Sequence, residues 1–279
     1  MKVPYEPIVE AARTYYNSPD ADTFYAEIWG GEDIHIGIYA RPDEPIADAS
    51  RRTVERLADL LGAVPADARI LDIGSGFGGA ARYLARRFGC EVVALNLSER
   101  ENERCEALNS AAGLDHLIDV VDGSFEDIPL ADGSVDVVWS QDAILHSGQR
   151  GKVVSEVARV LKPEGRFVFT DIMASGRCGP EALAPVLARI HLDTLGSVPF
   201  YQAAGAANGL AMTGWHDLSK ELPVHYARVA AELAGNREAL AGRVSAAYID
   251  RMLTGLHHWV DAGRAGCLTW GMLELRKHG

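Results

Sequence analysis

The sequence predicts an α/β fold built on a doubly wound, mostly parallel sheet. Short apolar segments typical of buried strands alternate with amphipathic helical segments between residues 69 and 172, which favours parallel strands joined by crossover helices. A glycine-rich turn follows the first of these strands, as expected where a sheet binds a ligand at its edge. No linker separates this core from its flanking segments, so we expect a single domain over residues 1–279.

Residues 5–30 precede the sheet and are expected to be helical, with an interruption before Ser18. Ser18 is suited to cap a second helix, and Pro19 occupies its first position. The glycine pair at 30–31 should end this helix. We interpret residues 1–45 as an N-terminal helical lid.

The core of the sheet is expected within residues 46–175. A helix with an apolar stripe precedes the first strand and should end at Gly62. Ser98 and Glu101 have the spacing of a capping box, which marks the start of a further helix. The five expected strands cover residues 69–73, 91–95, 117–121, 135–140 and 166–172.

The C-terminal part is less regular. Residues 180–208 and 223–262 have mostly helical periodicity, with a strand expected between them at 210–218. A final strand is expected at 268–275 and should close an edge of the same sheet. Residues 176–279 are therefore interpreted as a substrate cap, a helical insertion with closing strands.

The composition is that of an ordinary globular protein, with 48% hydrophobic and 24% charged residues. A net charge of −12 disfavours contact with phosphate backbones, so no nucleic-acid partner is expected. No apolar run reaches the roughly 18 residues of a membrane span, and no secretory signal is evident. We expect no membrane partner and a cytoplasmic location.

The four cysteines lack metal-ligand spacing and are expected to be reduced thiols, with no metal site. Whether the chain forms an oligomer stays open.

The glycine turn after the first strand contains Gly74, Gly76 and Gly79, which satisfy the pattern GxGxxG. Glycines at this place let the backbone turn tightly and let a ligand approach closely. The pattern alone does not separate NAD from S-adenosylmethionine. Asp72 inside the strand end favours S-adenosylmethionine, because it can either orient the loop or reach the amino acid end of that cofactor.

Further polar groups follow the third and fourth strands, where the segments begin at Asp122 and Ser140. The motifs DIGSGFGG, LNLSE, DGSFEDIPLADGSVDVVWSQDAILH and EVARVLKPEGRFVFTD resemble, in this order, a class I S-adenosylmethionine-dependent methyltransferase. The upstream segments YYNSPD and FYAEIWGGEDIHIGIY are similar to those of the bacterial sarcosine/dimethylglycine N-methyltransferases of betaine synthesis. The C-terminal part adds no motif to this resemblance.

The resemblance implies transfer of a methyl group from S-adenosylmethionine to the amine of sarcosine and/or dimethylglycine, giving glycine betaine. Asn96 departs from the pattern, because an acidic residue often stands there to hold the ribose. An asparagine offers one acceptor oxygen only, and this also counts against NAD. The residues expected to bind the cofactor are Asp72, Gly74, Ser75, Gly76, Asn96, Leu97, Asn102, Gly123, Ser124, Phe125 and Gln141.

Methyl transfer to an amine requires a free lone pair, so a protonated amine must first lose a proton. His146 follows the fourth strand and is our candidate base, with a pKa near 6.5 if unperturbed. A similar histidine in phosphoethanolamine methyltransferases pairs with an N-terminal tyrosine, which implies Tyr16 here, with Tyr15 as the alternative. The competing interpretations are that His146 binds only a backbone group or the cofactor carboxylate, and that Tyr16 is a core aromatic.

Tyr25 and Trp29 are four residues apart on one expected helix and should share a face. They are either core residues or a wall beside the cationic substrate, since aromatic faces attract cations. A substrate carboxylate calls for an arginine, and Arg177 and Arg41 are the candidates.

Other functions share these motifs. A natural-product O-, N- or C-methyltransferase would differ only in the pocket formed by residues 175–262. A catalytically silent protein that binds the same cofactor is a second alternative, and an NAD-dependent dehydrogenase is a third.

Overall fold

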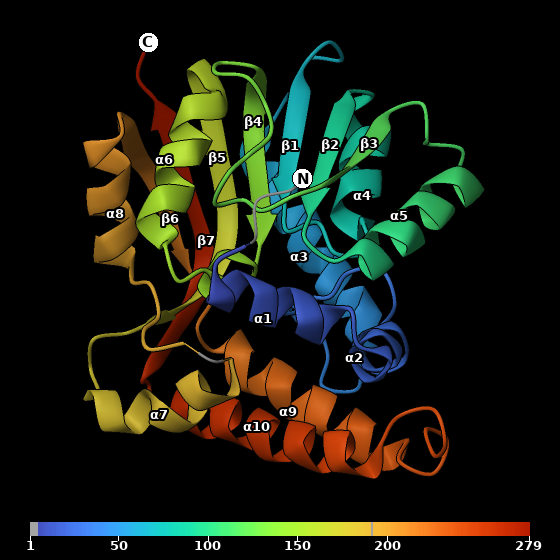
Figure 1. Ribbon diagram of the computed structural model, residues 1–279. Helices are drawn as coiled ribbons and strands as arrows, with labels where there is room; N and C mark the ends of the chain where they lie inside the picture. The colour runs from blue at the N-terminus through green and yellow to red at the C-terminus, as the bar shows by residue number, and fades with distance from the viewer. Residues whose placement is uncertain (1–4, 191) are drawn as a thin grey trace.

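The computed structural model describes residues 5–190 and 192–279, and the first four residues of the expected lid lie outside this part of the chain. Its centre is a seven-stranded sheet in the order β3-β2-β1-β4-β5-β7-β6 (Figure 1). Strands β1 to β5 pair in parallel, whereas β7 is antiparallel to both of its neighbours. The predicted doubly wound, mostly parallel α/β sheet is confirmed. The strands are β1 (Arg69–Ile73), β2 (Glu91–Asn96), β3 (Ile118–Asp122), β4 (Val135–Gln141), β5 (Leu161–Ala174), β6 (Leu210–Asp217) and β7 (Leu268–Lys277).

Helices cover both faces of the sheet and gather at one end of it, where β4 and β5 end (Figure 1). Along β1, Leu71 and Ile73 join the core cluster that contains the apolar side chains of α6 and α8. Ile70 points the other way and joins the cluster that contains those of α3 and α4. The helices are α1 (Pro7–Tyr16), α2 (Pro19–Phe24), η1 (Tyr25–Trp29), α3 (Ile46–Leu61), α4 (Gly79–Phe88), α5 (Glu99–Ala111), η2 (Ile144–His146), α6 (Arg150–Val160), α7 (Pro180–Arg189), α8 (Val198–Ala207), α9 (Glu221–Gly235) and α10 (Ala246–Arg264).

The helix starts and stops expected from local chemistry are present. Ser18 Oγ accepts a hydrogen bond from the Ala21 N–H at 3.2 Å, and Ser98 Oγ accepts one from the Glu101 N–H at 3.2 Å. Gly30 ends the lid helices with a φ of +119°, and a Cβ there would collide with the backbone of α3. Short-range signals therefore fixed these boundaries.

Two strands differ from the expectation. The last strand, β7, does not close an edge of the sheet but lies between β5 and β6, so β6 forms the edge. Strand β5 begins at Leu161 rather than at residue 166, because the intervening segment pairs with β4 as a bulge. Glu164 in this bulge has a φ of +64°, and the pairing shifts register between Val135 and Val137.

Two of the four cysteines form a disulfide, which corrects the expectation of four reduced thiols. Cys178 precedes α7 and is bonded to Cys267, which precedes β7. Cys90 and Cys105 are free and buried. The pairing was not apparent from spacing, because 89 residues of cap helices and strand separate the partners along the chain.

In residues 5–190 and 192–279, none of the helices combines the length and the apolarity that a membrane span requires. The same ranges contain no group of three or more His, Cys, Asp or Glu side chains placed to hold a metal ion.

We expect the disulfide to stabilise the fold, because it links the start of α7 to the start of the last strand. Closing a loop of 89 residues removes unfolded-state entropy, and native disulfides typically contribute about 2–4 kcal/mol. Replacing Cys178 and Cys267 together by serine should lower the free energy of unfolding by about this amount, as measured by urea unfolding. Reductant should destabilise the parent protein and leave the double variant unchanged. Equal free energies of unfolding would contradict this expectation.

Candidate active site

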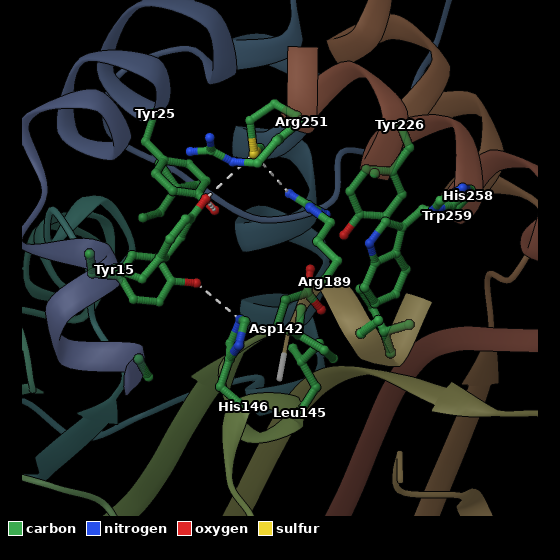
Figure 2. Close-up of a pocket in the computed structure, with 18 of the residues that line it drawn as sticks. Tyr15, Tyr25, Asp142, Leu145, His146, Arg189, Tyr226, Arg251, His258 and Trp259 are labelled. Carbon is green, nitrogen blue, oxygen red and sulfur yellow. Dashed lines mark hydrogen bonds between the residues drawn. The ribbon is translucent and has the colours of Figure 1, made fainter. Parts of the chain in front are cut away.

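A cavity of about 880 Å³ lies at the end of β4, between the sheet and helices from both ends of the chain (Figure 2). Its walls come from the lid helices α1 and η1, from η2 after β4, and from the cap helices α7, α9 and α10. The lid and the cap therefore meet over one space. The sequence-predicted residues that line this cavity are Tyr16, Tyr25, Trp29 and His146.

Tyr16 and His146 are in contact, as predicted. Tyr16 ends α1, His146 ends η2, and the Tyr16 hydroxyl lies 3.0 Å from His146 Nε2. Burial, reinforced by the positive charges of Arg189 and Arg150, lowers the pKa of His146 to about 4. Burial also raises the pKa of Tyr16 above its usual value. The phenol therefore stays protonated and the imidazole is neutral. In the tautomer with the proton on Nδ1, the phenol donates to Nε2 and its oxygen can accept a further hydrogen bond.

Three other tyrosines surround this pair. The Tyr15 hydroxyl lies 3.0 Å from the Tyr248 hydroxyl and 3.4 Å from that of Tyr25. The Tyr25 ring stacks on that of Tyr16, with centroids 5.7 Å apart. Burial raises the pKa values of Tyr25 and Tyr248, so their hydroxyls are neutral. The cluster offers electron-rich ring faces, which favour a cation, in a site largely removed from water.

Tyr25 and Trp29 share a face of η1, and both line the cavity. This segment is a π-helix, an uncommon turn that is frequent at functional sites. The two ring centroids are 5.4 Å apart. The Trp29 indole N–H donates to the His35 carbonyl oxygen at 3.0 Å, which fixes the ring against the segment that follows the lid helices.

Neither arginine proposed from the sequence lies in this cavity. Arg41 is 73% exposed and faces Asp43, whereas Arg177 is exposed beside a separate, smaller pocket. Arg189, the last residue of α7, lines the cavity instead. Its Nη2 lies 3.7 Å from Met252 Sδ, and no ion pair joins Arg189 to a carboxylate in residues 5–190 and 192–279.

Arg189 was missed because the periodicity of α7 indicates a helix and gives no hint of where its last side chain points. The available signal was a single arginine at the end of PEALAPVLAR, a segment whose only other charged residue is Glu181. Asp20, Asp142 and Asp250 also line the cavity, but among the described residues none of them forms an ion pair with Arg189. A cation among aromatic rings that no carboxylate neutralises directly is suited to bind an anionic group of a ligand.

The glycine loop lies beside this cavity, under the segment that follows the lid helices. Gly74 and Gly76 have φ values of +75° and +53°, a conformation that favours glycine. A Cβ on Gly74 would lie 2.4 Å from the Ala143 Cβ, and one on Gly76 would lie 3.0 Å from Ile34 Cδ1. The loop is therefore tightly enclosed between the end of β4 and residues 32–36.

Buried polar atoms without a protein partner follow the same edge of the sheet. They belong to β1, the glycine loop, α5 and β4 in turn, and they are Asp72 Oδ2, Ser75 Oγ, Asn102 Oδ1 and Gln141 Nε2. Unpaired buried groups are costly, so their alignment indicates a ligand with both donors and acceptors. Burial, with the nearby charge of Asp33, raises the pKa of Asp72 to about 8. The polar ends of S-adenosylmethionine fit this set of groups.

Asn96 has a carboxylate beside it that the sequence interpretation missed. The Asn96 side-chain amide donates to Glu101 Oε2 at 2.9 Å. Burial raises the pKa of Glu101 to about 7. Glu101 was expected only as the capping-box partner of Ser98, and its backbone N–H does bind the Ser98 hydroxyl. The Glu101 carboxylate therefore lies at the end of β2. The family resemblance implies an acidic residue there, and this chain has Asn96 at that position.

The remaining predicted cofactor residues lie around the ends of β2 and β3. Leu97 directly follows β2, and the Gly123 N–H donates to the Asn96 carbonyl at 3.0 Å. Ser124 Oγ accepts a hydrogen bond from the Glu126 N–H at 3.1 Å and so shapes the turn after β3. Phe125 Cε1 lies 3.7 Å from the position of a Cβ on Gly74. These residues therefore border the glycine loop, and their contacts with a cofactor stay predictions.

Comparisons with known proteins agree with this geometry. A methyltransferase domain family matches residues 71–169. The chain is 53% identical to a sarcosine/dimethylglycine N-methyltransferase of Halorhodospira halochloris, over 96% of each protein. It is 52% identical to a dimethylglycine N-methyltransferase of Parasynechococcus marenigrum, again over 96% of each. A crystal structure described as a sarcosine dimethylglycine methyltransferase, from Galdieria sulphuraria, superimposes with a TM-score of 0.90 at 42% identity, covering 95% of this chain and 99% of that one.

These similarities extend beyond the sheet. Because the matches span nearly the whole chain, they include the lid and the cap that enclose the cavity. An NAD-dependent dehydrogenase is therefore not supported.

Proposed function

Because this chain belongs to the sarcosine/dimethylglycine N-methyltransferase family of class I methyltransferases, we propose that it methylates sarcosine and/or dimethylglycine with S-adenosylmethionine as donor. The product of the last step is glycine betaine. The observation that carries the proposal is a single cavity with the Tyr16–His146 pair and the unpaired Arg189 on its walls. These groups suit the amine and the carboxylate of a small amino acid. A natural-product methyltransferase remains the alternative, and nothing in the cavity favours it.

S-adenosylmethionine would supply a methyl group activated by its sulfonium. The amine lone pair would form a bond to the methyl carbon as the C–S bond breaks, and S-adenosylhomocysteine would leave as a neutral thioether. The Tyr16 oxygen would accept the N–H of the protonated acceptor. With the imidazole proton on Nδ1, the Tyr16 hydroxyl would pass its own proton to His146 Nε2, 3.0 Å away. The low pKa of His146 keeps the imidazole neutral at physiological pH, so it can accept a hydrogen bond, and as a weak base it would hold the proton only transiently. Burial and the positive charge of Arg189 both disfavour a second cation, which lowers the pKa of a bound ammonium and favours the free amine.

The proposal places the methionyl end of the cofactor at Asp72 and the glycine loop. Ribose hydroxyls would meet Asn96 and Glu101 together. Support comes from the 2.9 Å contact between these two side chains, which positions a carboxylate where Asn96 alone offers an amide. The buried, unpartnered oxygen of Asn102 lies on the same helix as Glu101.

A cytoplasmic location belongs to the proposal as well. A disulfide is uncommon in a reducing compartment. The Cys178–Cys267 bond therefore counts against a cytoplasmic location. Fractionation of the source cells, followed by mass spectrometry of the two cysteines, would establish both the location and the redox state.

We expect Arg189 to hold the acceptor carboxylate. With labelled S-adenosylmethionine and a panel of amines, sarcosine or dimethylglycine should be methylated most efficiently. Arg189→Ala should raise KM for that acceptor by about 10- to 100-fold, since a charged hydrogen bond contributes about 1.5–3 kcal/mol. Arg189→Lys should recover part of the loss, because it keeps the charge without the planar fork.

Arg177→Ala is the matched control, since this exposed arginine lies outside the cavity. Its KM should equal that of the parent protein. Efficient methylation of acceptors that lack a carboxylate, with no effect of Arg189→Ala, would favour the natural-product alternative. Cofactor binding without turnover of any acceptor would instead identify a silent binding protein.

A further inference from the structure

A glycine in the middle of α10 lies directly against Arg189. Glycine is among the least favourable residues inside a helix, because it loses the most backbone freedom. Gly255 is nevertheless the tenth residue of the 19-residue helix α10, and it is buried. It is one of the residues that line the cavity, like Arg189 itself. A glycine at this position is explained if another group occupies the space that a side chain would fill.

The space beside Gly255 is filled by the arginine. A Cβ at this position would lie 2.4 Å from Arg189 Cδ, 2.8 Å from Nε and 3.3 Å from Cγ. Contacts shorter than about 3.4 Å between carbons lie inside the van der Waals optimum. The stem of Arg189 therefore crosses α10 through a notch that only glycine provides.

The rest of the same helix face fixes the far end of the side chain. Met252 precedes Gly255 by one helical turn, and Arg189 Nη2 lies 3.7 Å from its Sδ. Trp259 follows Gly255 by one turn and also lines the cavity (Figure 2). Residues three and four apart lie on one helix face. The Arg189 side chain thus crosses α10 at Gly255, with Met252 on one side of the crossing and Trp259 one turn away on the other.

We propose that Gly255 is a positioning residue for the acceptor: its missing side chain lets Arg189 lie across α10 with its guanidinium in the cavity. The inference rests on the proposed function, in which Arg189 binds the acceptor carboxylate. Arg189 ends α7, and an arginine side chain is long and flexible, so its charge alone does not define a binding geometry. The notch restricts the stem and so orders the guanidinium before the acceptor arrives.

The test is Gly255→Ala, which adds one methyl group and no charge. It should raise KM for dimethylglycine at least about 10-fold and change kcat less than about 3-fold, because it acts on ground-state binding. Calorimetric binding of dimethylglycine should weaken by the same factor. The melting temperature should be unchanged or higher, since alanine is the better helix former. Gly235→Ala is the control, because this last residue of α9 has open space at its Cβ, and its KM should not change.

A double-mutant cycle separates positioning from a general packing effect. In an Arg189→Ala background, Gly255→Ala should leave KM within about 2-fold, because the side chain that it displaces is gone. Parent-like KM and binding in Gly255→Ala would overturn the proposal. The same fold-change in both backgrounds would also overturn it. The single variants test the two hypotheses separately. Unchanged KM in Arg189→Ala would show that Arg189 does not bind the acceptor carboxylate, whereas unchanged KM in Gly255→Ala alone would show only that Gly255 does not position Arg189.

Discussion

Replacing Gly76 by valine should abolish binding of S-adenosylmethionine in a protein that still folds. Gly76 has a φ of +53°, and its Cβ position faces the Ile34 side chain, so a branched side chain would fill the narrow space over the glycine loop. A cofactor that contacts the loop backbone needs that space. We expect the dissociation constant to rise at least about 100-fold, which corresponds to about 2.7 kcal/mol. Calorimetric titration of the cofactor measures it directly.

Gly113→Val is the matched control for backbone strain. Gly113 has a φ of +66°, and nothing lies within 4 Å of its Cβ position. Valine there carries a comparable conformational penalty without touching the loop. Both variants should lose stability to a similar degree, while Gly113→Val alone should keep its cofactor affinity. Unchanged affinity in folded Gly76→Val would remove the glycine loop from the cofactor site.

The sheet and its edge could be predicted because the relevant signals are local or topological. Apolar periodicity fixed the strands, and serine caps fixed the helix starts. Parallel strands bring their carboxyl ends to one edge, so Asp72, near the end of β1, and His146, which follows β4, were expected near one site. Asp72 Oδ2 is buried without a protein partner, and His146 contacts Tyr16. Tyr16 came from the family resemblance, since no periodicity places an N-terminal helix over a sheet edge.

What could not be predicted depends on side-chain direction and long-range packing. Arg177 also follows a strand, but the chain turns at Gly176, with a φ of +75°, and leaves the side chain exposed. Arg189 enters the cavity because a glycine 66 positions later leaves room for it. Glu101 matches a capping signal, yet its carboxylate binds Asn96 instead. For Arg189 and Glu101 the decisive neighbour lies on another element of the fold.

His146→Ala should lower the rate by about 10²–10⁴-fold, the range of a general base, with little change in cofactor affinity. The variant lacks the imidazole whose Nε2 lies 3.0 Å from the Tyr16 hydroxyl and accepts its proton in the proposed mechanism. The variant should recover as pH rises, because solution then supplies more free amine. His146→Asn is the informative partner variant, since it keeps a hydrogen-bond acceptor that does not titrate. If proton acceptance matters, it should be nearly as slow as the alanine variant.

The structure also changes the expected pH profile of the parent protein. Burial and neighbouring arginines lower the pKa of His146 to about 4, so the imidazole is neutral, and able to accept a proton, at every pH above that value. The parent kcat should therefore show no inflection near the unperturbed value of 6.5 and should fall only as pH approaches about 4. Profiles of both proteins at saturating cofactor and acceptor provide the measurement. A deficit in His146→Ala that is flat across pH and accompanies a large loss of cofactor affinity would make His146 a cofactor ligand rather than a base.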